Sequence, residues 1–213
     1  MQDINLVQVL IAFLVLVFSL TVHESAHAWT AGRLGDPTGR RLGRVSLNPA
    51  AHVDPVGTLL FPLLAMITHL PIIGWARPVP VDARYLRNPR RDFLFIAAAG
   101  PLSNLALAVV AAAALRAVPA GPEAIGQMAV AAPLALVASV GLQINLLLAI
   151  FNMIPVPPLD GSSVVAGLVP ERVAAGLDRL RPYGFLVLYG LMLTGALGYL
   201  VGPPFNWMLS WLL

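Results

Sequence analysis

The sequence contains neither cysteine nor lysine, and it has few charged residues of any kind. Without cysteine there is no disulfide, no thiolate nucleophile and no cysteine-ligated metal, so any metal must be bound by His, Asp or Glu. Only 11% of the 213 residues are charged and 58% are hydrophobic, whereas a soluble domain carries about 25% charged residues. This composition indicates an integral membrane protein. The net charge of +3 then concerns membrane topology, and we expect no nucleic-acid partner.

The length fits one compact helix bundle without a separate soluble domain. We therefore interpret residues 1–213 as a single membrane domain, with a motif-bearing core at about 4–169 and C-terminal helices at about 170–213. The start of the chain holds Asp3 and no arginine, and the first apolar run has no small-residue cleavage site after it. We expect no cleavable signal peptide.

Four apolar runs are long enough to cross a hydrocarbon core of about 30 Å. They comprise residues 4–30, 93–118, 125–151 and 183–201. A shorter run, 56–73, is interrupted by two prolines and a histidine, and the C-terminal tail from Pro203 resembles an interfacial segment because it is short and contains two tryptophans. The sequence thus predicts an all-α polytopic membrane protein with four to six transmembrane or re-entrant helices.

The arginines are distributed unevenly between the apolar runs. Twelve of the thirteen fall on one side of the membrane if the run 56–73 does not cross it, and Arg116 alone falls on the other side. The arginine-rich side of a membrane protein is normally cytoplasmic. We therefore predict a multi-pass chain in the cell membrane with its N-terminus outside and a re-entrant or interfacial hairpin at 56–73.

The stretch GWARPVPVD, residues 74–82, has the pattern of an extended segment with one edge blocked. Pro78 and Pro80 remove the backbone donors from one edge of such a segment. The opposite edge keeps its donors at Arg77, Val79 and Val81, where a second chain could pair. A simple connecting loop is an equally good interpretation of the sequence alone.

Two histidines and a glutamate lie near the inner end of the first apolar run, in the stretch TVHESAHAW. His23 and His27 are four residues apart, so on a helix their side chains share one face and can bind one metal ion. Glu24 completes the H-E-x-x-H pattern, in which the glutamate activates a water bound to the metal. The alternative is a polar cluster that merely packs helices together.

A catalytic zinc site uses three protein ligands, so the two histidines leave one position to fill. Asp160 is the best candidate, because it lies in FNMIPVPPLDGSSV, where three prolines break the helix after the third long run. Taken alone, Asp160 would be interpreted as an N-cap that restarts a helix at Gly161. The unfilled ligand position favours one Zn²⁺ bound by His23, His27 and Asp160. One crossing by residues 93–118 brings both motifs to the cytoplasmic side, in agreement with the arginine distribution.

Three amides, Asn104, Asn145 and Asn152, lie inside or at the ends of apolar runs. Such amides often only bridge helices. An asparagine near the site could instead hold the substrate carbonyl or the developing oxyanion. Asn152 is the first candidate for this role because it lies beside the helix break, and Asn104 is a further one. His52 and His69 lack ligand spacing to another histidine, and we interpret both as structural.

Three motifs together resemble the site-2 proteases, a family of intramembrane zinc metalloproteases. They are HESAH at 23–27, GPLSN at 100–104, and NMIP followed by LDG at 152–161. The resemblance implies that His23, His27 and Asp160 are zinc ligands and that Glu24 is the general base. It also implies a membrane-associated β-hairpin after the first motif helix, to which GWARPVPV is similar, and the short prokaryotic type without a PDZ domain. The insert 56–73 departs from the plainest members.

These observations predict an enzyme that hydrolyses peptide bonds within or next to transmembrane segments, with a zinc-bound water activated by Glu24. Its expected partners are the transmembrane segment of a substrate protein and the lipid bilayer, and a homo-oligomer is left open. An ion or metal transporter that uses the same His/Asp cluster is the alternative, although transporters usually contain paired repeats and none is evident. A catalytically silent scaffold that retains zinc is a third interpretation, against which the intact Glu24 argues.

Overall fold

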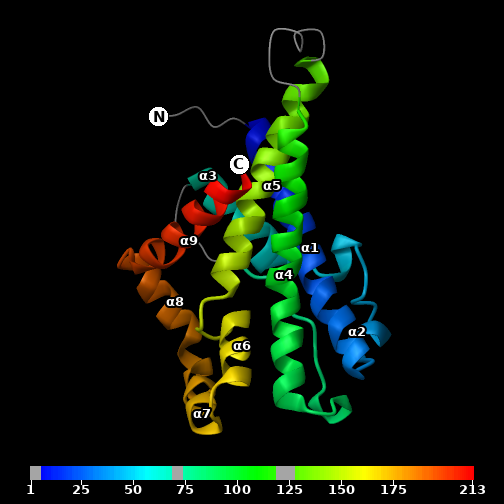
Figure 1. The fold of residues 1–213 in the computed structure, drawn as a ribbon, viewed down its shortest axis with the longest axis vertical. Helices are drawn as coiled ribbons and strands as arrows, with labels where there is room; N and C mark the ends of the chain where they lie inside the picture. The colour runs from blue at the N-terminus through cyan, green and yellow to red at the C-terminus, as the bar shows by residue number, and fades with distance from the viewer. Residues whose placement is uncertain (1–5, 69–73, 119–127) are drawn as a thin grey trace.

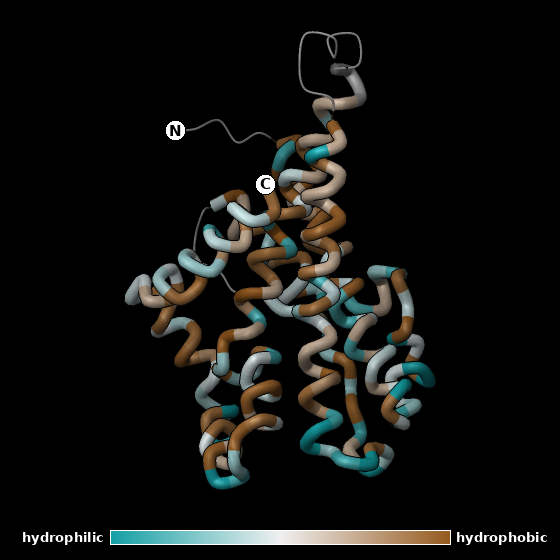
Figure 2. The backbone as a smooth tube through the Cα atoms, viewed as in Figure 1, coloured by the Kyte–Doolittle hydropathy of each residue, from teal (hydrophilic) through white to brown (hydrophobic). Residues whose placement is uncertain are grey.

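The computed structural model describes residues 6–68, 74–118 and 128–213. Its centre consists of three long helices, α1 (Leu6–Leu34), α4 (Pro89–Arg116) and α5 (Met128–Asn152), each of which contacts the other two (Figure 1). Within the described residues, α1, α4 and the part of α5 from Ala131 to Asn152 are each long and apolar enough to cross a membrane. Figure 2 shows hydrophobic residues along these helices. This architecture is that of a membrane protein, because a helix satisfies its backbone groups internally in hydrocarbon.

Short helical elements fill the connection between α1 and α4. They are α2 (Thr38–Arg41), η1 (Pro49–Ala51), η2 (Pro55–Leu60), α3 (Phe61–Thr68) and η3 (Ala83–Tyr85). η2 has π-helical geometry and runs directly into α3, and the Asp54 carboxylate caps its start by accepting hydrogen bonds from two backbone N–H groups.

The chain returns to the start of η2 after α3. The N–H of Trp75 donates to the carbonyl of Gly57 at 3.0 Å, and the Trp75 ring contacts Phe61 edge-on. Gly57 and Trp75, which lie near the two ends of the predicted hairpin, are therefore neighbours. Residues 69–73 of that segment lie outside the described part of the chain.

The predicted β-hairpin is not found, since the residues that the structure describes contain no strand. Pro78 and Pro80 carry no N–H, so one edge of the segment 74–82 cannot donate. On the other edge, Trp75 and Arg77 donate to the carbonyls of two residues that lie in short helices or their caps, Gly57 and His52. These are isolated hydrogen bonds, because no facing strand supplies the regular ladder of a sheet.

The C-terminal quarter is a series of short helices. They are α6 (Asp160–Leu168), α7 (Glu171–Leu180), η5 (Arg181–Tyr183), α8 (Gly184–Leu193) and α9 (Ala196–Leu212). The predicted span at 183–201 is not one straight helix, because the helical stretches on either side of Gly195 meet at a bend of 78°. Gly195 has a φ of +75°, in the left-handed region that glycine adopts most easily.

The tail from Pro203 is not separate from the last apolar run. It forms the second half of α9, where Phe205, Met208 and Leu209 pack against a buried cluster that α4 and α5 form with Ala108 and Leu142. α9 therefore closes the core on one side of α5.

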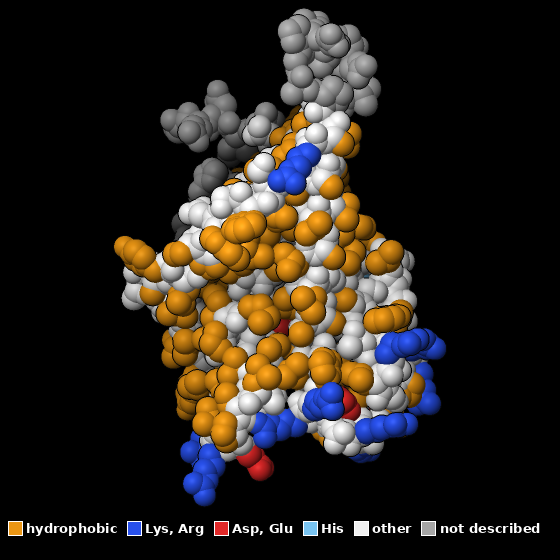
Figure 3. Space-filling model, viewed as in Figure 1, with side chains coloured by type: hydrophobic (Ala, Val, Ile, Leu, Met, Phe, Trp, Pro, Cys, Tyr) orange, Lys and Arg blue, Asp and Glu red, His pale blue; other side chains and the backbone are white. Residues whose placement is uncertain are grey.

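Arginine side chains gather at one end of the molecule. Figure 3 shows arginine side chains along the lower end, below the hydrophobic surface, while α4 ends in Arg116 at the opposite end. The predicted asymmetry of charge is thus present in the fold.

Candidate metal centre

Two helices bring three metal-binding side chains together. His23 and His27 project from α1, and Asp160 is the first residue of α6. The Asp160 carboxylate lies with Oδ2 3.1 Å from Nε2 of His23 and Oδ1 3.4 Å from Nε2 of His27. One ligand atom from each residue lies within 4.8 Å of the others. The structure therefore assembles the three residues that the sequence predicts as ligands.

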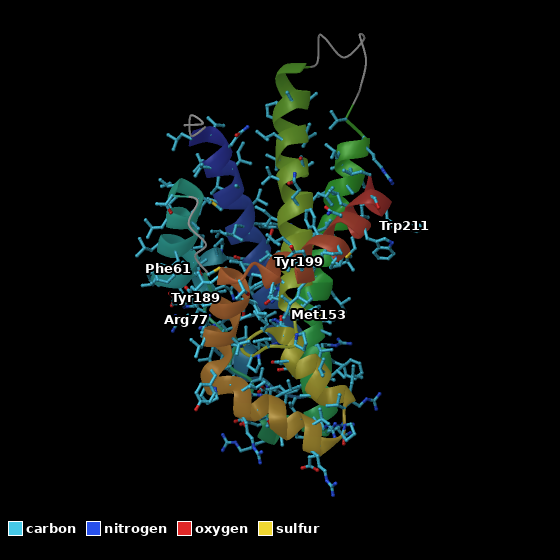
Figure 4. The ribbon with its side chains drawn as sticks, turned by 90° about the vertical axis from the view of Figure 1, so that its left-hand side faces the viewer. Phe61, Arg77, Met153, Tyr189, Tyr199 and Trp211 are labelled. Atoms are coloured by element: carbon cyan, nitrogen blue, oxygen red, sulfur yellow. The ribbon has the colours of Figure 1, made fainter. Side chains whose placement is uncertain are left out.

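The break between α5 and α6 places Asp160. α5 ends at Asn152, and Figure 4 labels Met153 at the start of the irregular stretch that follows. Gly161 allows α6 to begin against this stretch, because a Cβ on it would lie 2.2 Å from the carbonyl oxygen of Met153. The three prolines and Gly161 thus turn the chain back toward α1.

Both histidines are held through their Nδ1 atoms. Nδ1 of His23 lies 2.6 Å from Oδ1 of Asn104, and Nδ1 of His27 lies 2.6 Å from the carbonyl oxygen of Ile96, both on α4. With Nδ1 engaged, the Nε2 atom of each ring is the one that faces Asp160. Metal-binding histidines are commonly oriented by such a bond on the other ring nitrogen.

The donor set fits Zn²⁺. Two imidazole nitrogens and a carboxylate make a three-ligand catalytic site, and bonds of about 2.0 Å in a tetrahedron separate neighbouring ligand atoms by about 3.3 Å. The distances of 3.1 and 3.4 Å, each to a different oxygen of Asp160, are of this size. Oδ2 of Asp160 is also buried and makes no well-formed hydrogen bond, although it lies close to His23. Gly100 adds the space, since a Cβ on it would lie 2.4–2.5 Å from both Nε2 atoms.

Glu24 is half-buried and follows His23 on α1. Its carboxylate makes no hydrogen bond to any residue that the structure describes, which leaves it available as a base. Asn152 lies at the end of α5, where its Nδ2 donates to the carbonyl of Leu148 at 3.0 Å. Asn104 differs from the prediction, because it is fully buried and faces His23 rather than an open position for substrate.

The segment 74–82 passes beside α1 close to His27. A Cβ on Gly39 would contact both Ala28 and a methyl group of Val79, which places Val79 near the turn that follows His27. Val79 and Val81 have no partner for their backbone N–H within the described chain, whereas the N–H of Arg77 donates to His52. The ring of Trp75 contacts Phe185, so α8 covers this segment from the side seen in Figure 4.

The sequence reasoning missed Arg44. It is buried, and its Nη1 donates to the carbonyl of Ala51 and, at 3.5 Å, to that of Arg77. Burial and the charge of Arg77 lower the pKa of the Arg44 guanidinium, against the opposite effect of nearby Glu24. Arg44 thus ties two loops together beside the candidate base. Nothing in its sequence context distinguishes it from Arg40 and Arg41, which are exposed.

Comparisons with known proteins find relatives that are named as zinc metalloproteases. The chain is 38% identical to a Bacillus subtilis protein named "Putative zinc metalloprotease YwhC" over 192 residues, which are 90% of this chain and 84% of that protein. It is 32% and 30% identical to proteins named "Putative zinc metalloprotease Rip2" from Mycolicibacterium smegmatis and Mycobacterium tuberculosis strain H37Rv, of which it spans 66% and 65%. No protein-family model matches the chain, and no solved structure matches it significantly.

Proposed function

The chain belongs to the site-2 protease family of zinc metalloproteases, and on this basis we propose that it cleaves peptide bonds within or next to transmembrane segments of other membrane proteins. One observation carries the proposal. His23, His27 and Asp160 converge beside an unpaired Glu24, on a helix that is long and apolar enough to span a membrane. An ionisable group inside a membrane-spanning helix costs free energy unless it has a partner or a function.

The residues have distinct roles in the proposed reaction. His23, His27 and Asp160 hold one Zn²⁺, which when bound supplies Lewis acidity toward water and the substrate carbonyl. Glu24 takes a proton from the attacking water, the water oxygen bonds to the peptide carbonyl carbon, and the C–N bond then breaks. Glu24 returns the proton to the leaving nitrogen, so it ends the cycle as a carboxylate.

A helical substrate must unwind locally, because its carbonyl groups are engaged in i→i−4 hydrogen bonds. The N–H groups of Val79 and Val81, which donate to no residue that the structure describes, offer replacement bonds to an unwound stretch. Arg77 lacks this capacity because its N–H already donates to His52. The second N–H of the Asn152 amide is left to donate to the substrate carbonyl or the oxyanion.

The proposed setting is a multi-pass protein of the cell membrane. The arginine-rich end is placed in the cytoplasm and the N-terminus outside, by the positive-inside rule. The partners are then a substrate transmembrane segment and the bilayer, while a homo-oligomer stays a prediction without a supporting contact. The transporter alternative is not favoured, since the named relatives are zinc metalloproteases.

Metal analysis and cleavage of a reconstituted transmembrane peptide test this function together. Glu24→Gln should keep its zinc and lose about 10²–10⁴-fold in cleavage rate. Asp160→Ala should bind zinc more weakly and be inactive. Proteolysis that resists a chelator, or full activity in Glu24→Gln, would refute the proposal.

A further inference from the structure

A chain of buried polar groups lies behind His23 and has no part in the reaction described above. Beyond its contact with His23, Asn104 donates from Nδ2 to Oδ1 of Asn145 at 2.9 Å and to the carbonyl of Ser19 at 3.3 Å. Asn145 in turn donates from Nδ2 to the Ser19 hydroxyl and to the carbonyl of Gly141, both at 2.9 Å. Ser19 and Asn104 are 0% exposed and Asn145 is 3% exposed, so water does not complete these bonds.

Two backbone carbonyls fix the direction of every bond in this network. A carbonyl oxygen only accepts, so the Asn145 atom facing Gly141 must be the NH₂ group and its Oδ1 must face Asn104. The Asn104 atom facing the Ser19 carbonyl is the NH₂ group for the same reason. Oδ1 of Asn104 is then the atom at His23, and it also only accepts. Nδ1 of His23 must therefore donate, which places the ring proton on Nδ1.

We propose that Asn104 and Asn145 are positioning residues that fix His23 in the Nδ1–H tautomer and leave its Nε2 lone pair free for the metal. The inference rests on the proposed metal site. His27 reaches the same tautomer without a side chain, because its Nδ1 faces the carbonyl of Ile96. Each ligand histidine thus has an acceptor on α4, but only the acceptor of His23 can rotate, and Asn145 holds it in place.

Neutral amides suit this position. The common side-chain acceptor behind a metal-binding histidine is a carboxylate. A carboxylate at position 104 would add a second negative charge to the interior of the helix bundle, which already contains Asp160. Asparagine provides the acceptor without the charge, at the expense of needing a second amide to set its orientation.

In the metal-free native protein the Asp160 carboxylate accepts at the Nε2 atoms of both histidines, so the tautomer is measured in metal-free Asp160→Ala protein. The nitrogen shifts of this ¹⁵N-histidine-labelled variant report the tautomer directly, in detergent above pH 8. The four histidines are assigned from His→Gln variants. His23 should carry its proton on Nδ1 in this variant and on a mixture of both nitrogens when Asn104→Leu is added. His27 is the internal control and should stay Nδ1–H in both. A His23 with its proton on Nε2 in Asp160→Ala overturns the inference, even if the native protein binds no zinc and the proposed function fails.

Zinc competition against a chelator gives the second measurement. Asn104→Leu should weaken zinc binding about 10–100-fold, and Asn145→Leu should weaken it less, because the Ser19 carbonyl still orients Asn104. Asn104→Asp should recover most of the affinity, since it restores an acceptor. Asn206→Leu on α9 is the matched control, because Asn206 is exposed, and should bind zinc as the native protein does.

Native zinc affinity together with an unchanged His23 signal in Asn104→Leu overturns the role of Asn104. If Asn104→Leu does not fold, Asn145→Leu is measured in its place. An altered His23 signal with an unchanged His27 signal supports the network. An unchanged His23 signal together with native zinc affinity overturns it.

Discussion

Gly100 of α4 approaches His27 so closely that a Cβ on the glycine would lie 2.4 Å from Nε2 of the histidine. The same Cβ would lie 2.5 Å from Nε2 of His23. Zinc–nitrogen bonds are about 2.0–2.1 Å long, so a methyl group at this position would compete with a metal ion for the space between the two nitrogens. The glycine of GPLSN therefore keeps the metal position open.

Gly100→Ala should remove zinc binding while the helix bundle stays folded. Alanine is favoured over glycine in a helix by about 1 kcal/mol, so loss of metal would come from the methyl group rather than from a weaker helix. Zinc per chain after gel filtration measures the effect. Gly32→Ala on α1 is the control, because its Cβ would meet nothing within 4 Å, and it should keep its zinc. A Gly100→Ala variant with full zinc content would contradict this account.

Chelation should lower the thermal midpoint of the protein, because the metal binds the folded site. A ligand present at about 100 times its Kd stabilises the fold by about 2.7 kcal/mol. The shift should disappear in Asp160→Asn, which lacks the anionic ligand, and persist in Asp178→Asn, which changes an exposed carboxylate paired with Arg181. Equal midpoints with and without chelator in the native protein would argue against a bound metal.

The candidate ligands could be predicted because their chemistry constrains them locally. The spacing of His23 and His27 sets a common helix face, and a three-ligand site then selects Asp160 among the acidic residues. The roles of Asn104 and Asn145 could not be predicted in this way. An amide in an apolar helix has the same sequence pattern whether it faces a substrate or a neighbouring helix, and only the packing of α1, α4 and α5 decides.

The fold was predictable to a similar degree. Three of the four long apolar runs correspond to α1, α4 and α5, since length and hydropathy suffice to define them. The bend at Gly195 was missed because the apolar run continues through it and a single glycine is tolerated in a helix. Whether residues 74–82 form a strand depends on the residues that face them, which the sequence does not give. Their neighbours Gly57 and His52 lie in short helices or their caps, so no facing strand is present there.

Arg44→Met should lower both stability and cleavage while zinc is retained. The substitution keeps much of the side-chain volume but leaves the carbonyls of Ala51 and Arg77 without their donor, and each buried unsatisfied group costs about 1–3 kcal/mol. Thermal unfolding and peptide cleavage measure the two effects. Arg41→Met, an exposed residue of the same loop, should change neither. An Arg44→Met protein with native midpoint and rate would show that the two loops are held by other contacts.

Asn152→Leu should lower kcat about 10²–10³-fold, as expected for a lost oxyanion donor, with unchanged zinc affinity. Asn104→Leu should instead lower the zinc affinity first. Comparing zinc affinity and kcat in the two variants separates a group that meets the substrate from one that orients a ligand. Loss of zinc in Asn152→Leu would instead place Asn152 among the residues that hold the site together.

Val79→Pro should reduce cleavage of a transmembrane peptide without changing zinc content. The substitution removes the N–H that is free to pair with an unwound substrate. Val79→Ala is the matched control, since it shortens the side chain that reaches Gly39 but keeps the N–H. We expect Val79→Ala to cleave nearly as fast as the native protein, and Val79→Pro to show a raised KM, because the lost bond holds the substrate before the reaction. Equal rates in native protein and Val79→Pro would exclude this edge as the substrate site.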